Sequence, residues 1–314
     1  DSLRLHEHRS WRRLLHYESG EQTSSVLTDS FFLADEGRSN PRAELAATLS
    51  AYFQTDVNGD AHPRCRFPAR YYWLSHQLEL PGYEPAQHCP KLQAWGLFEQ
   101  VQSVSLLMVS GYLGNPASTF GHSLLKFNTD NSRDAPSLFE PTVNYGANVP
   151  QQVNPLLYIL RGVTGGYEGG FSDNYFYTQD LIYSRREFRD MWEYRLALTD
   201  YQRILLGLHV WEMLGKKYQY FFFDRNCGFR LAELFDLVIE EELLGGAGWW
   251  YAPVDLFHQI DSINENRIRA GKPGIIASVA FVPSARRKLF YELSGLHHSE
   301  IRVLNQMVEE EYAF

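Results

Sequence analysis

The sequence predicts an α+β fold in which an antiparallel sheet packs against a cysteine-bearing helix, after a helical N-terminal region. Apolar residues in the first part of the chain recur at helical spacing, whereas the part after residue 102 alternates β-branched or apolar runs with turn-rich segments. An aromatic run then leads directly into an amphipathic stretch that opens with Cys227. We expect a helical N-terminal domain (1–98), a thiol domain (99–250), and a mixed, partly helical C-terminal extension (251–314) packed on it.

Proline marks the helix starts that we predict in the N-terminal region. Its fixed backbone angle and missing N–H suit the first helical position, so helices are expected from Pro41 and from Pro68. The segment "CPKLQAWGLFEQV" (89–101) predicts one more helix.

Two of the three cysteines, Cys65 and Cys89, lie in loop-like segments that contain proline. If a helix brings them together, a disulfide would stabilise the fold by about 3 kcal/mol in the chain-entropy model and would indicate an oxidising compartment. Two free thiols are the alternative. Cys227 is then the odd cysteine, and an unpaired thiol calls for a reason.

The predicted thiol domain is built from strands and helices. Thr199 and Gln202 form a capping-box pattern that predicts a helix start. The stretch 162–177 is predicted to be a mobile loop or hairpin, because it contains five glycines among its aromatic residues. The other predicted elements are strands at 103–113, 122–128, 137–149 (interrupted by Pro141), 191–198 and 218–223, and helices at 154–163, 228–244 and 299–314.

Composition excludes several classes of function. The net charge of −9 argues against a general nucleic-acid-binding protein. The aromatic content of 15% suits an apolar or membrane-proximal substrate, or else simply an aromatic-rich core. No run of about 18 apolar residues occurs, so we expect no membrane-spanning segment. Because it starts at Asp1, we interpret the chain as a mature or trimmed form.

Cys227 is the first candidate catalytic residue. Asn226 is a favoured N-cap residue, which places Cys227 in the first turn of a helix. Free backbone N–H groups and the helix dipole favour an anion there, so the thiol should have a lowered pKa and act as a nucleophile. The same N–H groups could stabilise an oxyanion. The alternative is a small buried apolar residue at a helix start.

A thiol nucleophile needs a base, and we select His122 from the 11 histidines because it stands where a loop of small residues enters a strand. The alternative for His122 is a structural core or edge histidine. Asn144, on the next presumed strand, is expected to orient the imidazole, and its neighbour Tyr145 should face the other side of that strand. The candidate substrate-binding residues are Ser118, Ser123, Tyr145, Tyr167 and Asn226.

No metal or cofactor is expected. Cys227 has no Cys or His partner at zinc-ligand spacing, and "GVTGGYEGG" lacks the Lys and the strand–helix setting of a phosphate-binding loop.

The segments "SGYLGNPASTFGHSLLKF" and "YQYFFFDRNCGFRLAELFD", in this order, resemble circularly permuted papain-like enzymes of the NlpC type, and more specifically the Lnb N-terminal periplasmic domain family. That family includes lipoprotein N-acyltransferases, and the match covers roughly residues 100 to 245. The resemblance implies a Cys–His thiol site at Cys227 and His122, and a place in the periplasm of a Gram-negative cell envelope.

Three functions remain open at this point. The resemblance implies a cell-envelope acyltransferase or acyl hydrolase that acts on a lipid or lipoprotein through a Cys thioester, with a membrane surface or a membrane-anchored C-terminal region as a possible partner. In that case the 162–177 segment, with Tyr167 and Phe171, could cover an acyl chain. The alternatives are a cysteine peptidase or amidase acting on peptidoglycan peptides and a non-catalytic binding module. An apolar tunnel would favour the lipid substrate, and an open polar groove the peptide.

Overall fold

The computed structural model describes residues 3–80, 89–95, 100–114, 118–129, 138–150, 154–245 and 248–311. Within them, seven strands form one sheet with the order β6-β4-β3-β2-β1-β5-β7, in which all neighbours are antiparallel. The strands are β1 (Ser103–Val109), β2 (His122–Asn128), β3 (Pro141–Ala147), β4 (Tyr167–Tyr175), β5 (Met191–Leu196), β6 (Tyr218–Tyr220) and β7 (Ile276–Val282).

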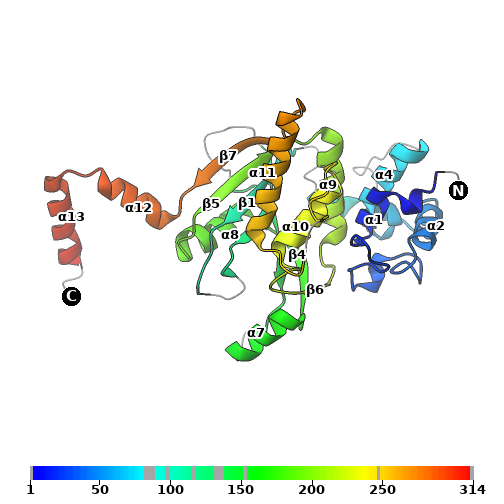
Figure 1. The fold of residues 1–314 in the computed structure, drawn as a ribbon, viewed down its shortest axis with the longest axis horizontal. Helices are drawn as coiled ribbons and strands as arrows, with labels where there is room; N and C mark the ends of the chain where they lie inside the picture. Colours follow the sequence, from blue (N-terminus) through cyan, green and yellow to red (C-terminus); the bar gives the residue numbers. More distant parts are fainter. Residues whose placement is uncertain are drawn as a thin grey trace.

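Helices cover both faces of the sheet. On one face lie α9 (Asp200–Met213), α10 (Cys227–Asp236) and α11 (Pro253–Arg269), and α10 packs on β2 and β3 (Figure 1). On the other face, α8 (Phe176–Gln179) and the π-helical turn η5 (Asp180–Arg186) close a smaller apolar cluster with Leu107, Leu124 and Met191. The larger core lies between the sheet and the α9–α11 layer and contains Cys227.

The N-terminal region is helical and packs against the outer side of α9 and α10 (Figure 1). Its helices begin at Pro41 and Pro68, as predicted. Of the segment 89–101, a helix spans Pro90–Trp95, and residues 96–99 lie outside the described part of the chain. The helices are α1 (Arg9–Leu14), α2 (Pro41–Ala51), α3 (Pro63–Arg66), α4 (Pro68–Leu78) and α6 (Pro90–Trp95), with short 3-10 turns η1 (Leu5–Glu7), η2 (Asp29–Phe31) and η3 (Gly59–Ala61).

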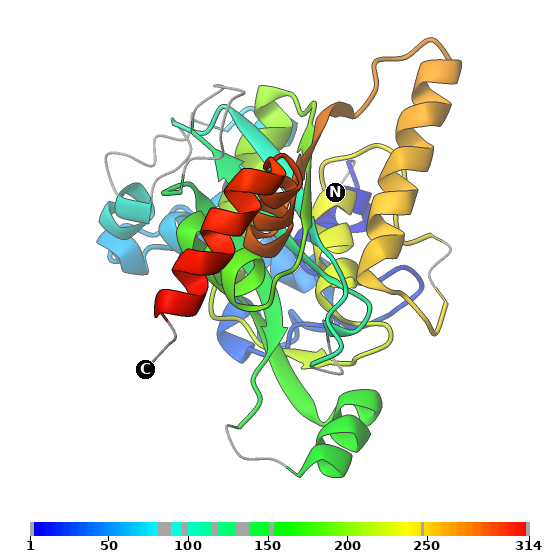
Figure 2. The same ribbon diagram turned by 90° about the vertical axis from the view of Figure 1, so that its left-hand side faces the viewer.

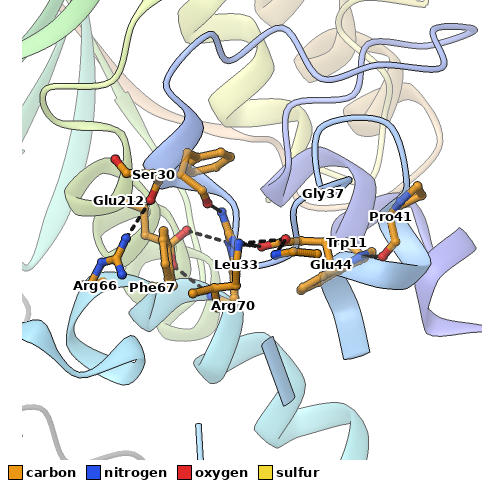
Figure 3. A network of polar contacts seen from close by, with 12 residues as sticks. Trp11, Ser30, Leu33, Gly37, Pro41, Glu44, Arg66, Phe67, Arg70 and Glu212 are labelled. Atoms are coloured by element: carbon orange, nitrogen blue, oxygen red, sulfur yellow. Dashed lines mark hydrogen bonds and ion pairs between the residues drawn. The ribbon is translucent and has the colours of Figure 1, made fainter. Parts of the chain in front are cut away.

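A buried ion-pair network joins this region to α9 (Figure 3). Arg70 on α4 pairs with Glu44 on α2 at 2.6 Å, and both side chains are fully buried. Glu44 also accepts the backbone N–H of Leu33, and Glu212 on α9 accepts the N–H groups of Ala69 and Arg70. Because each buried charge here has partners, the network holds the two regions in one arrangement.

The 162–177 segment corrects our expectation of a mobile loop or hairpin. Residues 167–175 form β4, an internal strand paired with β3 and β6. Its glycines allow close packing: a Cβ on Gly169 would lie 2.6 Å from the hydroxyl of Tyr145, and one on Gly170 would lie 2.8 Å from the carbonyl oxygen of Lys216. These glycines therefore allow neighbouring groups to pack closely against the strand and do not make the segment flexible.

Other boundaries also shift. The strand expected at 218–223 is only Tyr218–Tyr220, the helix expected to 244 ends at Asp236, and Pro141 begins β3 instead of interrupting it. The helix predicted at 154–163 is α7 (Pro155–Thr164). After β7, α12 (Ala285–Ser294) and α13 (His298–Glu311) extend away from the sheet (Figure 1). None of the helices in the described ranges is both long and apolar enough to cross a bilayer.

Candidate active site

Asn226 starts the helix that carries the thiol. Its Oδ1 accepts hydrogen bonds from the N–H groups of Gly228 and Phe229, at 3.0 and 3.4 Å. Its Nδ2 donates to the carbonyl oxygen of Tyr251 at 2.6 Å. The asparagine is thus a buried N-cap, as the sequence predicts, and Cys227 is the first residue of α10.

This cap uses first-turn donors that we expected to be free for an oxyanion. The N–H groups of Gly228 and Phe229 donate to Asn226. Of the first three N–H groups of the helix, the one that remains for an oxyanion is that of Cys227 itself. Gly228 also permits tight packing, because a Cβ there would lie 2.6 Å from the Cα of Pro253 at the start of α11.

His122 is the first residue of β2, and it contacts Cys227. By strand alternation His122 belongs to the sheet face away from α10, whereas Ser123 belongs to the face that α10 covers. The imidazole therefore meets the sulfur at the end of the strand and not across the face of the sheet. Gly121 precedes it with φ of 93°, a backbone conformation that favours glycine.

The thiol of Cys227 is acidic for a buried group. Burial is the largest influence and raises its pKa, but the charge and hydrogen bonding of His122, together with the hydroxyl and backbone N–H of Ser123, bring the pKa down to about 7. Among the described residues, the Nε2 of His122 and the hydroxyl of Ser123 meet no partner at strict hydrogen-bond geometry. The contact with sulfur is therefore longer or less well aligned than a formed hydrogen bond, as is common in unliganded thiol sites.

Asn144 lies on β3, on the same sheet face as His122. It is the register partner of Leu124, which makes it a diagonal neighbour of His122. No hydrogen bond joins the two side chains among the residues the structure describes. The orienting role of Asn144 therefore stays a prediction.

An open cleft of about 600 Å³ lies at this end of the sheet. Its walls include three of our candidates besides His122, namely Ser118, Asn144 and Tyr145. Ser123 is buried beside the thiol, Tyr167 is buried against Tyr158, and Asn226 is used by the cap. The other lining residues are Gly114, Gly146, Ala147, Val149, Pro150, Tyr158, Tyr183 and Tyr220.

Three lining tyrosines surround the thiol, and sequence analysis identified only Tyr145. Burial raises the pKa of Tyr145 to about 12 and holds those of Tyr183 and Tyr220 above the usual range, and the charge of Cys227 contributes to each. All three phenols therefore remain neutral donors. Tyr183 lies 5.7 Å from the ring of His122, and Tyr220 stacks on Tyr145 at 5.6 Å. No local pattern marks Tyr183 or Tyr220, because only the packing of η5 and β6 brings them here.

The N-terminal region contacts the same helix behind the thiol. Arg230 on α10 pairs with Glu233 at 2.6 Å and donates to Ser25 at 2.9 Å. His16 reaches Glu233 at 3.5 Å and places its Nε2 3.1 Å from that of His209 on α9. Burial raises the pKa of Glu233, but Arg230 and His16 outweigh it and bring the pKa to about 2, so this carboxylate is ionised.

Cys65 and Cys89 form a disulfide, which closes the loop that precedes the sheet. In the described part of the chain, no group of three or more His, Cys, Asp or Glu side chains is placed to hold a metal ion.

Comparison with family models gives two matches. Residues 91–262 match the Lnb N-terminal periplasmic domain, and residues 3–77 match a domain of unknown function, DUF7843. No curated protein and no solved structure matches the chain. The first match contains the cleft, His122 and Cys227, and it spans more than half of the chain. The domain is therefore a periplasmic one, and the disulfide is consistent with a cell-envelope location. The chain belongs to the Lnb N-terminal periplasmic domain family.

Proposed function

We propose that this protein is a thiol-dependent acyltransferase or acyl hydrolase of the cell envelope that acts on a lipid or lipoprotein. The observation that carries the proposal is the Cys227 thiol at the start of α10, whose pKa is brought to about 7 by contact with His122. A thiol with this pKa is about half ionised at neutral pH, and the thiolate is the nucleophilic form.

The reaction proceeds in two balanced steps. The sulfur of Cys227 attacks an ester carbonyl, a C–S bond forms, the C–O bond breaks, and the leaving alcohol takes a proton from the imidazolium of His122. An amine or water then attacks the thioester, His122 accepts its proton, and the thiolate leaves. The N–H of Cys227 and a neutral tyrosine such as Tyr145 are the donors available for the oxyanion.

We further propose that the sheet and α10 form a circularly permuted papain-like domain with Asn144 as the third member of the site. The order of His122 before Cys227, a strand-borne histidine and a helix-borne cysteine support this assignment. Asn144 lies on the strand next to His122, which is compatible with this role if the imidazole rotates toward Asn144 when the substrate binds.

A cysteine amidase or peptidase on peptidoglycan peptides is the second candidate. The cleft favours it in one respect: it is an open groove that presents the polar groups of Ser118, Asn144 and several tyrosines instead of an apolar tunnel. A non-catalytic module is the third candidate, and its mark would be a Cys227 thiol that lies far from any histidine or is buried and inert. Cys227 is buried, but it contacts His122 and its pKa is lowered, so this candidate is less well supported.

Activity assays with two substrates, a chromogenic acyl ester and a stem-peptide amide, distinguish these functions. We expect the wild type to cleave the ester and to show an acyl adduct on Cys227 by mass spectrometry. Cys227→Ala should abolish both, and His122→Ala should abolish turnover while the protein stays folded. Amide cleavage without an acyl adduct from a lipid donor would favour the amidase, and ester cleavage retained in Cys227→Ala would remove both catalytic proposals.

A further inference from the structure

Helix α7 exposes its apolar side chains to solvent. Leu156 is 79% exposed and Leu160 is 59% exposed, and Leu157, Ile159 and Val163 are exposed as well. A surface helix usually presents polar residues to water and buries its apolar stripe. In α7 the arrangement is reversed, and the only charged side chain is Arg161.

The helix is capped at both ends and contacts the body of the protein through one side. Asn154 caps its start through the N–H of Leu156, and Gly165 ends it with φ of 75°. On its inner side, a Cβ on Gly162 would lie 2.3 Å from the ring of Phe222, and the N–H of Phe222 donates to the carbonyl oxygen of Gly162 at 2.8 Å. Figures 1 and 2 show α7 projecting from the body of the protein beyond β4.

The apolar face continues into the cleft that His122 and Asn144 line. Tyr158 of α7 lines the cleft and packs on Phe222 with ring centroids 5.1 Å apart. The next residue, Phe223, stacks on Trp250 at 5.0 Å, and Trp250 also contacts Phe120, two residues before His122. Trp249, which precedes Trp250 in the chain, is 82% exposed. Exposed tryptophan is typical of the membrane–water interface.

We propose that α7, together with Trp249 and Trp250, docks the mouth of the cleft on a lipid bilayer. The proposal rests on the proposed function and deepens it, because it places the cleft beside the buried Cys227 at the surface where an acyl ester would be presented. An apolar helix beside exposed tryptophans is the pattern of a helix that lies in the bilayer interface.

Size and the apolar character of the exposed side chains favour lipid over a protein occupant. A ten-residue helix is about 15 Å long, so its exposed side offers on the order of a few hundred Å² of accessible surface, against about 800 Å² per partner in a stable dimer. The aliphatic side chains offer no directional hydrogen bonds to a protein partner. The net charge of −9 also opposes attraction to anionic lipid, so insertion of apolar side chains must drive the binding.

Vesicle co-sedimentation of the full chain tests the proposal. The probe is vesicles of phosphatidylethanolamine with a minor fraction of phosphatidylglycerol, at low and high salt. We expect the wild type to bind at both salt concentrations, since apolar insertion is not screened. The double variant Leu156→Glu/Leu160→Glu should bind at least about tenfold more weakly.

The matched control is Ile268→Glu/Leu289→Glu, which adds the same charge at similarly exposed aliphatic residues on α11 and α12. It should bind like the wild type. The reactivity of Cys227 with a soluble disulfide reagent should be equal in all three proteins, which shows that the site is intact.

Absence of wild-type binding, or equal binding by the α7 variant, would overturn the proposal. A concentration-dependent dimer by light scattering that the α7 variant loses would assign the face to a second copy instead. The binding assay does not require turnover. If the protein binds vesicles but has no catalytic activity, the docking face is supported and only the proposed function is refuted.

Discussion

The influence of His122 on the Cys227 thiol can be measured directly, because Cys227 is the free cysteine of the structure and the other two form the disulfide. With a pKa of about 7 the thiol is about half ionised at pH 7. If His122→Ala returns the pKa to the ordinary value of 9.0, the ionised fraction at pH 7 falls to about 1%. The thiolate population therefore drops by about fiftyfold.

The observed rate should drop by less, because a more basic thiolate is a better nucleophile. With a Brønsted coefficient of about 0.4 to 0.5, a two-unit rise in pKa makes each thiolate about eightfold more reactive. We therefore expect His122→Ala to react with a small aromatic disulfide about sixfold more slowly than wild type at pH 7. Above about pH 8 the order should reverse, because the wild-type thiol is then almost fully ionised while the more reactive thiolate of the variant is still increasing.

The assay is the rate of thiol–disulfide exchange followed by absorbance from pH 5 to 11. His258→Ala, which removes an exposed histidine elsewhere, is the control and should leave the wild-type profile unchanged. A change in access alone would scale the rate equally at every pH. Superimposable midpoints for wild type and His122→Ala would refute the reasoning that the imidazole holds the thiol in its reactive form.

Three further predictions concern stability. Replacing Cys65 and Cys89 by serine opens a loop with a sequence separation of 24 and should lower the free energy of unfolding by about 3 kcal/mol in urea titrations; an unchanged midpoint would contradict the chain-entropy estimate. Burial lowers the pKa of His16 to about 4, although Glu233 partly opposes this shift. Below pH 6.5 the unfolded chain therefore binds a proton at His16 that the folded protein does not bind. Stability should fall from pH 7 to pH 5 by about 2 kcal/mol more in wild type than in His16→Gln, and equal slopes would count against a neutral His16. Gly162→Ala places a methyl group against Phe222 and should cost about 1 to 3 kcal/mol by thermal unfolding, whereas a neutral effect would show that α7 can move freely.

Local chemistry accounts for the parts of the fold that the sequence predicts well. Pro41 and Pro68 start helices because proline loses nothing at the first helical position. Thr199 and Gln202 form the capping box, and Asn226 caps α10 so that Cys227 opens the helix. Each of these features depends only on residues within one helical turn, so the amino-acid sequence is sufficient to predict it.

The 162–177 segment shows where local rules are insufficient. Glycine favours a loop when only neighbouring residues are considered. Here Gly169 and Gly170 admit the Tyr145 hydroxyl and a distant backbone carbonyl, so the same residues support an internal strand. The sequence alone offers no sign of which residue will approach a glycine from another strand.

The sequence by itself determined the α+β class, the helix that opens with Cys227, the pairing of this thiol with His122, and the resemblance to the family. Only the tertiary structure decided that the imidazole meets the sulfur at the end of β2, that Tyr183 and Tyr220 complete the surroundings of the thiol, and that α7 faces solvent with its apolar side. Caps and periodicity are short-range effects, whereas burial and pKa depend on groups that lie far apart in the chain and meet only when the sheet closes.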